Sequence, residues 1–174
     1  MKRAVSFILV LLLLACMSTA AYAKKPSECT SSVVRILVFD QDGFPYATGS
    51  GFAIGTEQPI SYIVTNYHVI EDFPTNAYVW RSKDDIIKCY VAQALQICDL
   101  VLLQLSEPLY GIDPLPLGDM SMAAPGDPVY ALGFPGENYS DFDDAYSENV
   151  TVTSGTIGKL TKWNDVDCYQ TDCT

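Results

Sequence analysis

The sequence is poor in histidine and in positive charge. It contains a single histidine, His68, so a metal site built from several histidines is excluded. It has 10 lysines and arginines and 21 aspartates and glutamates, which gives a formal net charge of −11. Binding to the phosphates of nucleic acids requires clustered cations, and the few cations of this chain are spread along it. The composition therefore argues against a nucleic-acid-binding protein.

The sequence also lacks the patterns of a metal centre, a redox dithiol and a long helix. No C-x-x-C pair occurs and the chain has a single histidine, so neither a redox dithiol nor a structural zinc site is predicted. No helical periodicity extends beyond a turn or two, which predicts an all-β protein. Hydrophobic residues make up 49% of the 174 residues, and 7 Phe, 11 Tyr and 2 Trp are among them. An intrinsically disordered chain is thereby excluded.

Residues 1–23 are predicted to be a cleaved export signal. Lys2 and Arg3 precede the apolar stretch 4–15, and residues 21–23 form an A-x-A cleavage pattern. The apolar stretch is shorter than the ~20 residues that span a bilayer. We therefore expect an exported protein (periplasmic, cell-envelope or extracellular) with no integral membrane segment after cleavage. Residues 13–16 resemble a lipoprotein cleavage box, so a lipid-anchored form remains an alternative, as does an uncleaved anchor.

The chain after the signal is predicted to consist of short β-strands separated by turn residues. Six strands at this spacing favour a small closed barrel, because closure removes the exposed edges of a sheet. The expected strands are 33–40, 46–54, 60–65, 77–81, 86–94 and 99–105.

A segment rich in proline and glycine then interrupts the strand pattern. We expect a first barrel over residues 24–106, a connector over 107–127 and a second half over 128–174. Strands are predicted to resume at 128–133, 149–153 and 155–160, with a last one from about Asp167. Since the sequence stops inside that strand, we expect the second half to be incomplete. Residues 136–148 form an acidic loop without the ligand spacing of an EF-hand, which predicts a solvated surface loop.

His68 and Asp99 are the candidate chemical groups. A β-rich apolar segment delivers His68 at the end of a strand, and Asp99 opens another strand that is otherwise almost wholly apolar. A carboxylate in such a place is costly to bury unless it is paired, and an imidazole N–H is its natural partner. That pairing fixes the tautomer that leaves the second ring nitrogen free as a base. Each residue alone is more often structural, but together they predict a catalytic pair.

The segment Thr65-Asn66-Tyr67-His68-Val69-Ile70 resembles the T-N-x-H-V-[VI] motif of HtrA-like serine proteases. Four further segments are similar to blocks of that family, in the same order, and the likeness covers about residues 31–174. These segments are 98–103 (CDLVLL), 126–136 (GDPVYALGFPG), 150–158 (VTVTSGTIG) and 169–172 (YQTD).

The resemblance implies a fold and an activity. The fold would be a chymotrypsin-like double six-stranded β-barrel, with the first barrel complete and the second truncated. His68 would be the general base and later the general acid, and Asp99 would orient it. The family's nucleophile lies in a G-N-S-G-G motif that the 174 residues do not contain, so we expect the serine beyond Thr174. The complete protein would be an exported trypsin-like serine endopeptidase acting on proteins or peptides, and the 174-residue chain itself would be inactive.

Two other functions remain open at this point. The chain could be a non-catalytic binding or scaffold module with a protease fold, although such a module needs neither His68 nor Asp99. A cysteine protease of the same fold is disfavoured, because no cysteine lies in a suitable glycine loop. The cleavage preference and the oligomeric state are left open.

Export would place the cysteines in an oxidising compartment. Five of them lie after residue 23, so at least one lacks a partner within the chain. A hairpin that turns near residues 94–96 would bring Cys89 and Cys98 almost opposite each other, which makes a disulfide between them an expectation.

Overall fold

The computed structural model describes residues 24–82, 85–135 and 150–173. The predicted export signal, the acidic loop 136–148 and Asn149 lie outside the described residues. The chain begins with a short helix α2 (Pro26–Cys29) and a 3-10 turn η1 (Thr30–Ser32) that lead into the first strand. Within the described part of the chain, no helix has the length and apolar character needed to cross a membrane.

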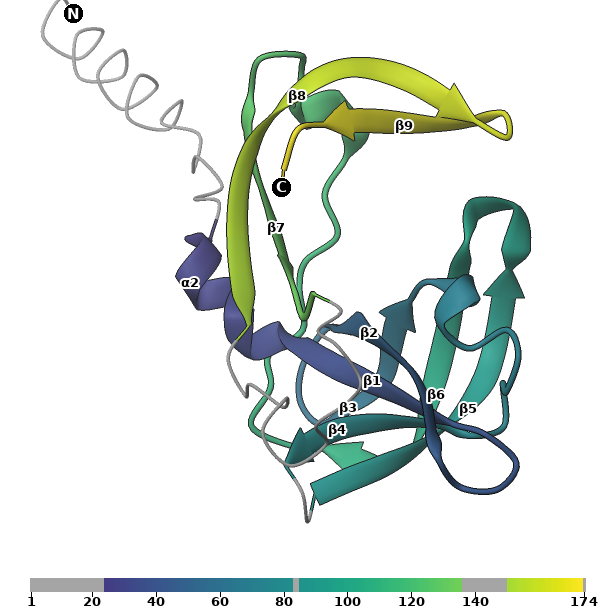
Figure 1. The fold of residues 1–174 in the computed structure, drawn as a ribbon. Helices are drawn as coiled ribbons and strands as arrows, with labels where there is room; N and C mark the ends of the chain where they lie inside the picture. Colours follow the sequence, from purple (N-terminus) through teal and green to yellow (C-terminus); the bar gives the residue numbers. More distant parts are fainter. Residues whose placement is uncertain (1–23, 83–84, 136–149, 174) are drawn as a thin grey trace, which may run out of the picture.

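Six antiparallel strands close into a barrel, as the strand spacing predicted (Figure 1). Their order around the barrel is β1-β2-β3-β6-β5-β4. β4 also pairs with β1, which closes the barrel and leaves no open edge. The strands are β1 (Val33–Phe39), β2 (Pro45–Ile54), β3 (Ile60–Thr65), β4 (Ala77–Ser82), β5 (Asp85–Leu95) and β6 (Leu100–Leu109). β6 continues past the predicted end at residue 105.

The core of the molecule fills this barrel. Ile36 lies opposite Val79 on β4, and Ile63 of β3 lies opposite Leu103 of β6. All four side chains are fully buried. Burying an aliphatic side chain of this size contributes ~1.5–3 kcal/mol. Along β6, every second residue from Val101 to Leu105 is buried, as expected for a strand with one face toward the core.

A close approach at Gly49 of β2 fixes the segment that follows β3. A Cβ atom at Gly49 would lie 2.6 Å from one methyl carbon of Val69 and 2.8 Å from the other. Glycine therefore allows the buried Val69 to pack against β2. Because Val69 follows His68 directly, this contact helps to set the position of the histidine.

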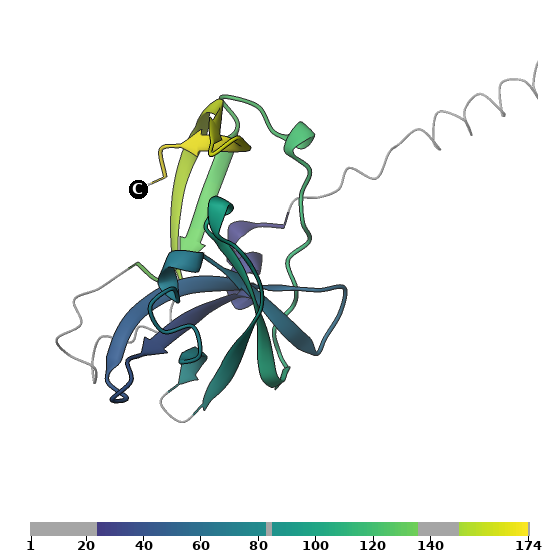
Figure 2. The same cartoon turned by 90° about the vertical axis from the view of Figure 1, so that its right-hand side faces the viewer.

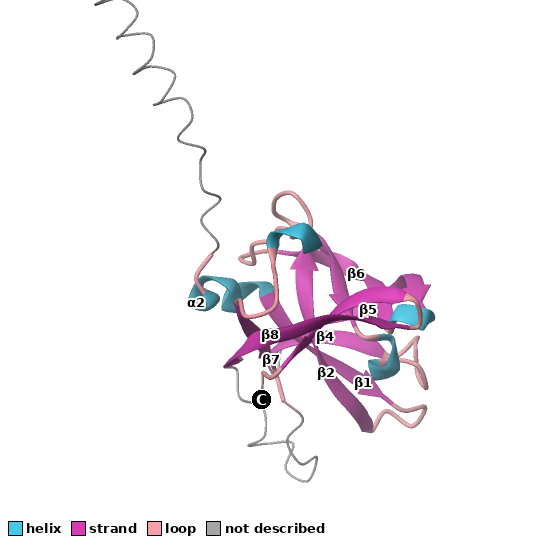
Figure 3. Ribbon diagram, turned by 90° about the horizontal axis from the view of Figure 1, so that it is seen from above, coloured by secondary structure: helices cyan, strands magenta, loops and turns pink. Residues whose placement is uncertain are grey.

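The second half of the described chain is a three-stranded sheet that stands beside one end of the barrel (Figures 1 and 2). Its strands are β7 (Pro128–Gly133), β8 (Thr151–Trp163) and β9 (Val166–Thr171), in the order β7-β8-β9. A 3-10 turn η4 (Met120–Met122) lies in the segment between the barrel and this sheet. The view in Figure 3, coloured by secondary structure, shows strands in both parts and only short helical turns. The chain is thus mostly β, as predicted.

The prediction of two separate strands at 149–153 and 155–160 was wrong. One long strand, β8, runs through both segments, and its first part pairs with β7 while its second part pairs with β9. Ser154, which was expected to separate the two strands, stays in register with Tyr130, and Gly155 stays in register with Val129. Gly155 is needed for another reason, since a Cβ there would lie 2.6 Å from the Asp172 carboxylate and 2.6 Å from the Cys173 nitrogen.

The expected disulfide between Cys89 and Cys98 is also contradicted. Cys89 of β5 pairs with Leu105, whereas Cys98 belongs to η3 (Gln96–Cys98), the 3-10 turn at the far end of the hairpin. The six strand residues from Tyr90 to Leu95 separate Cys89 from that turn, a distance of ~20 Å along the strand. A disulfide requires Cα atoms within about 7 Å. Both cysteines are free thiols.

Candidate active site

His68 lies in a 3-10 turn, η2 (Tyr67–Val69), directly after β3. The turn is closed by hydrogen bonds from the Val69 nitrogen to the Asn66 carbonyl (3.3 Å) and from the Ile70 nitrogen to the Tyr67 carbonyl (3.0 Å). The side chains of Val69 and Ile70 are buried in the barrel core. The apolar residues after the histidine therefore anchor the turn, and the His68 side chain remains 64% exposed.

Asp99 ends the η3 turn and immediately precedes β6. The prediction that it opens the strand was therefore off by one residue. Its backbone is left-handed, with φ of 53°, and its nitrogen donates a 3.0 Å hydrogen bond to the Gln96 carbonyl. Aspartate tolerates this conformation better than most residues. The left-handed residue turns the chain sharply between η3 and β6.

The structure brings His68 and Asp99 together, 31 positions apart in the chain. The His68 Nδ1 lies 2.6 Å from the Asp99 Oδ2, and the His68 backbone N–H donates to the Asp99 Oδ1 at 2.8 Å. An ionised carboxylate only accepts hydrogen bonds, so the proton between them belongs to Nδ1. In the neutral ring, Nε2 then carries the free lone pair and can act as a base.

Asn66 adds a contact that the sequence reasoning did not assign. Its side-chain amide donates to the Asp99 carbonyl oxygen at 3.1 Å and to Oδ2 at 3.2 Å. The Tyr67 backbone N–H also donates to the Asp99 carbonyl, at 3.1 Å. The carboxylate is thus oriented from both ends of the segment 66–68. In the sequence, Asn66 stood out only as a member of the histidine motif. Its contact with Asp99 could not be predicted, because it depends on how the two turns meet.

The environment of Asp99 favours its ionised form. Partial burial raises the pKa of the carboxyl, but the hydrogen bonds from the His68 backbone and ring, the charge interaction with His68 and the Asn66 amide together outweigh it. The net effect is an Asp99 pKa below the usual value. At neutral pH the residue is therefore a carboxylate, which is the form that holds the Nδ1 proton.

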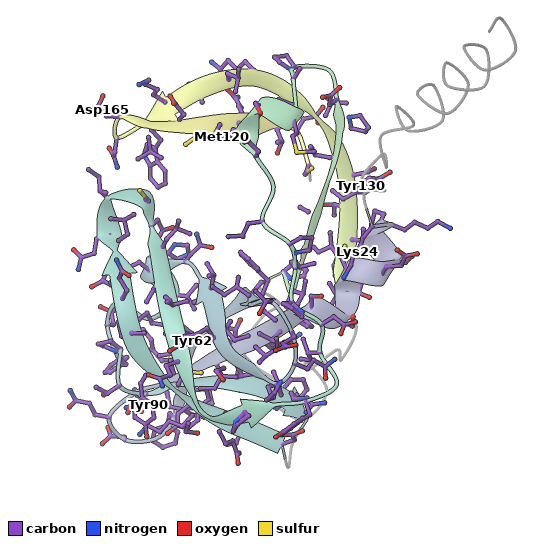
Figure 4. All side chains as sticks on the ribbon, turned by 180° about the vertical axis from the view of Figure 1, so that it is seen from behind. Lys24, Tyr62, Tyr90, Met120, Tyr130 and Asp165 are labelled. Carbon is purple, nitrogen blue, oxygen red and sulfur yellow. The ribbon has the colours of Figure 1, made fainter. Side chains whose placement is uncertain are left out.

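An apolar cavity of about 500 Å³ lies between the barrel and the three-stranded sheet. Asn66 and Leu100 line it from the barrel, and Tyr130 and Leu132 line it from β7. Figure 4 shows Tyr130 on the sheet and Tyr62 and Tyr90 on the barrel. Asn66, which contacts Asp99, is thus the residue that links the cavity to the pair, while His68 and Asp99 do not line the cavity themselves.

The pair can accept and return a proton, but it does not include a nucleophile. No G-x-S-G-G or G-x-C-G motif occurs in the 174 residues. Over residues 24–82, 85–135 and 150–173, no cluster of three or more His, Cys, Asp or Glu side chains could hold a metal ion. With Asp99 holding the proton on Nδ1, the free Nε2 of His68 has the geometry to accept a proton and to return it.

Comparison with protein families finds a match to the trypsin-like peptidase domain over residues 49–174. The matched range contains His68, Asp99 and all strands from the second part of β2 to β9. No curated protein matches the chain.

Proposed function

Since this chain belongs to the trypsin-like peptidase domain family, we propose that His68 and Asp99 are the acid–base part of a serine endopeptidase's catalytic triad. The 2.6 Å contact between Nδ1 and Oδ2 is the observation that supports this role. It places the proton on the nitrogen that faces Asp99 and leaves Nε2 available to a substrate or a nucleophile.

In the proposed reaction, Nε2 takes the proton of a serine hydroxyl while the serine oxygen attacks the carbonyl carbon of a peptide bond. The resulting imidazolium is stabilised by the Asp99 carboxylate. Nε2 then gives the proton to the leaving amine, which breaks the C–N bond and leaves an acyl-enzyme. A water molecule, activated in the same way, releases the second product and restores the serine. No metal or organic cofactor takes part in these steps.

The serine is proposed to follow residue 174 in a G-N-S-G-G sequence, as in HtrA-like proteases. The Q-T-D segment at Gln170–Asp172 supports this placement, because it resembles the part of the family sequence that leads to the nucleophile. The substrates would be proteins or peptides, and the protein would be exported by the signal at residues 1–23. The 174-residue chain would bind no acyl group by itself.

The test begins with the gene beyond codon 174. If a G-N-S-G-G sequence follows in frame, we expect the full product to hydrolyse casein and to react with a fluorophosphonate at that serine. Asp99→Asn should lower kcat ~10⁴-fold and His68→Ala ~10⁶-fold. Asp42→Asn, a change at an exposed loop carboxylate, is the control and should leave kcat unchanged. An in-frame stop codon would contradict the proposal and support a non-catalytic binding module. So would a full-length gene product that neither hydrolyses casein nor reacts with the fluorophosphonate.

A further inference from the structure

A second contact joins the turn that carries His68 to the turn that carries Asp99. The Gln96 side-chain amide donates a hydrogen bond of 2.8 Å to the hydroxyl oxygen of Tyr67. Tyr67 directly precedes His68 in η2, and Gln96 opens η3, which ends at Asp99. This contact is called the Tyr67–Gln96 link below. The link includes neither the His68 ring nor the Asp99 carboxylate.

Both ends of the link are tied to Asp99 through the backbone. The Gln96 carbonyl accepts the Asp99 N–H at 3.0 Å, and the Tyr67 N–H donates to the Asp99 carbonyl at 3.1 Å. The two turns are therefore joined into a closed circuit of hydrogen bonds around Asp99. Inside that circuit, the left-handed backbone of Asp99 has little freedom to rotate.

The two partners differ in how they are held. The Tyr67 ring is partly buried and packs against the barrel core, so its hydroxyl has a fixed position. Gln96 lies on an exposed turn at the tip of the β5–β6 hairpin. The same turn is also held at Ile97, whose carbonyl accepts a 3.1 Å hydrogen bond from the Asn164 side-chain amide. The link adds a side-chain contact between η2 and η3, from an exposed glutamine to a tyrosine that packs on the core.

We infer that Tyr67 and Gln96 are positioning residues, which keep the Asp99 carboxylate in contact with Nδ1 and so maintain the Nδ1–H tautomer of His68. Their importance for catalysis rests on the proposed peptidase function, but their effect on the tautomer does not. The histidine motif of the sequence leaves the position of Tyr67 open, so the link is a property of this chain and was not assigned from the motif.

The test uses the only histidine of the chain as a reporter. In protein labelled with ¹⁵N-histidine, the ring signals arise from His68 alone, and they report which nitrogen carries the proton and how fast the Nδ1 proton exchanges with water. We expect Tyr67→Phe and Gln96→Ala each to raise that exchange rate about fivefold, the effect of losing one hydrogen bond. The double variant should show no larger effect than either single one, because both remove the same contact.

Two matched controls and one positive control define the outcome. Tyr62→Phe and Gln104→Ala alter a tyrosine and a glutamine elsewhere on the barrel wall, and they should leave the exchange rate unchanged. Asp99→Asn should abolish the protected Nδ1 proton. Exchange rates equal to wild type in both Tyr67→Phe and Gln96→Ala would overturn the inference, as would additive effects in the double variant. The amide spectrum verifies the fold, and Gln96→Ala on its exposed turn decides the question if Tyr67→Phe does not fold.

A separate readout addresses catalysis. In a full product that hydrolyses peptides, Gln96→Ala should lower kcat severalfold with little change in KM, since the link acts on His68 and Asp99 and lies outside the reacting groups. A full product without hydrolysis would contradict the proposed function and leave the NMR result intact. If Gln96→Ala instead raised KM severalfold and left kcat unchanged, Gln96 would be a substrate-binding residue, and its positioning role would be overturned.

Discussion

The backbone N–H of Phe134 donates a 2.7 Å hydrogen bond to the hydroxyl oxygen of Ser50, 84 positions away. Phe134 follows β7 of the three-stranded sheet, and Ser50 lies in β2 of the barrel. The Ser50 carbonyl also accepts the Thr65 hydroxyl at 2.7 Å, and Thr65 ends the strand that leads to His68. A single residue thus connects the sheet, the barrel and the strand that delivers the histidine.

An arginine strengthens the same junction. The Arg35 guanidinium carbon lies 4.7 Å from the centre of the Phe134 ring and 5.5 Å from that of Trp80. Arg35 is buried, with 7% of its surface exposed, so its charge acts on the two rings with little screening by water. A Cβ at Gly133 would lie 2.6 Å from the Ser50 hydroxyl oxygen, which explains the glycine beside Phe134.

Removal of the Ser50 hydroxyl should loosen the sheet from the barrel. Ser50→Ala leaves the Phe134 N–H without its acceptor, at a cost of about 1–3 kcal/mol. Hydrogen exchange of the Phe134 amide should accelerate more than that of Ile63 in the barrel core. Ser61→Ala, at a partly exposed serine of the neighbouring strand β3, is the control. Equal protection of Phe134 in Ser50→Ala and wild type would show that the junction does not depend on this hydrogen bond.

An added methyl group at Gly49 should displace the turn of His68. In Gly49→Ala the new Cβ would lie 2.6 Å from a Val69 methyl carbon, so either the turn or β2 must shift. We expect a loss of about 1–3 kcal/mol in the free energy of unfolding, measured with urea. Gly118→Ala is a matched control, because a Cβ at Gly118 meets nothing within 4 Å. A Gly49→Ala protein as stable as Gly118→Ala would mean that Val69 adapts without strain.

The barrel and the contact between His68 and Asp99 could be predicted from the sequence for different physical reasons. The barrel strands could be predicted because short apolar segments such as 33–40 and 60–65 are separated by turn residues. The contact between His68 and Asp99 was predicted because a carboxylate at the head of an apolar strand needs a partner. Both signals are local properties of short segments.

The remaining features depend on geometry that no short segment contains. Ser154-Gly155 has the composition of a turn, yet pairing with β7 keeps it in a strand. The supporting contacts of Asn66 and of Gln96 arise only where two turns from distant parts of the chain meet. The failed Cys89–Cys98 prediction has the same origin, because a small error in the place of a hairpin turn shifts every residue pair along it.

Asp99 should make the stability of the protein depend on acid pH. Its folded-state pKa lies below the usual aspartate value of about 3.9, so its stabilising contribution is complete above that value and is lost as the pH falls through the folded pKa. In Asp99→Asn this contribution is absent, and the decline of stability below about pH 4 should be shallower. Urea unfolding of both proteins between pH 7 and pH 2.5 measures the difference. Parallel curves would show that Asp99 titrates equally in the folded and unfolded states.

Cys89 should resist alkylation while the fold is intact. Its side chain is fully buried between β4, β5 and β6, and this burial raises the pKa of the thiol to about 12. At pH 8 almost none of it is thiolate, which is the reactive form, and reagent has no access to it. Cys98, in the partly exposed η3 turn, is free to react.

Mass mapping after a short treatment with iodoacetamide at pH 8 should therefore find Cys98 modified and Cys89 unmodified. The same treatment in urea should modify both, because unfolding exposes Cys89 and returns its pKa to about 8.5. The urea sample also separates burial from cross-linking, since a disulfide-bonded Cys89 would stay unmodified there until a reductant is added. Modification of Cys89 as rapid as that of Cys98 in the folded protein would contradict its place in the barrel core.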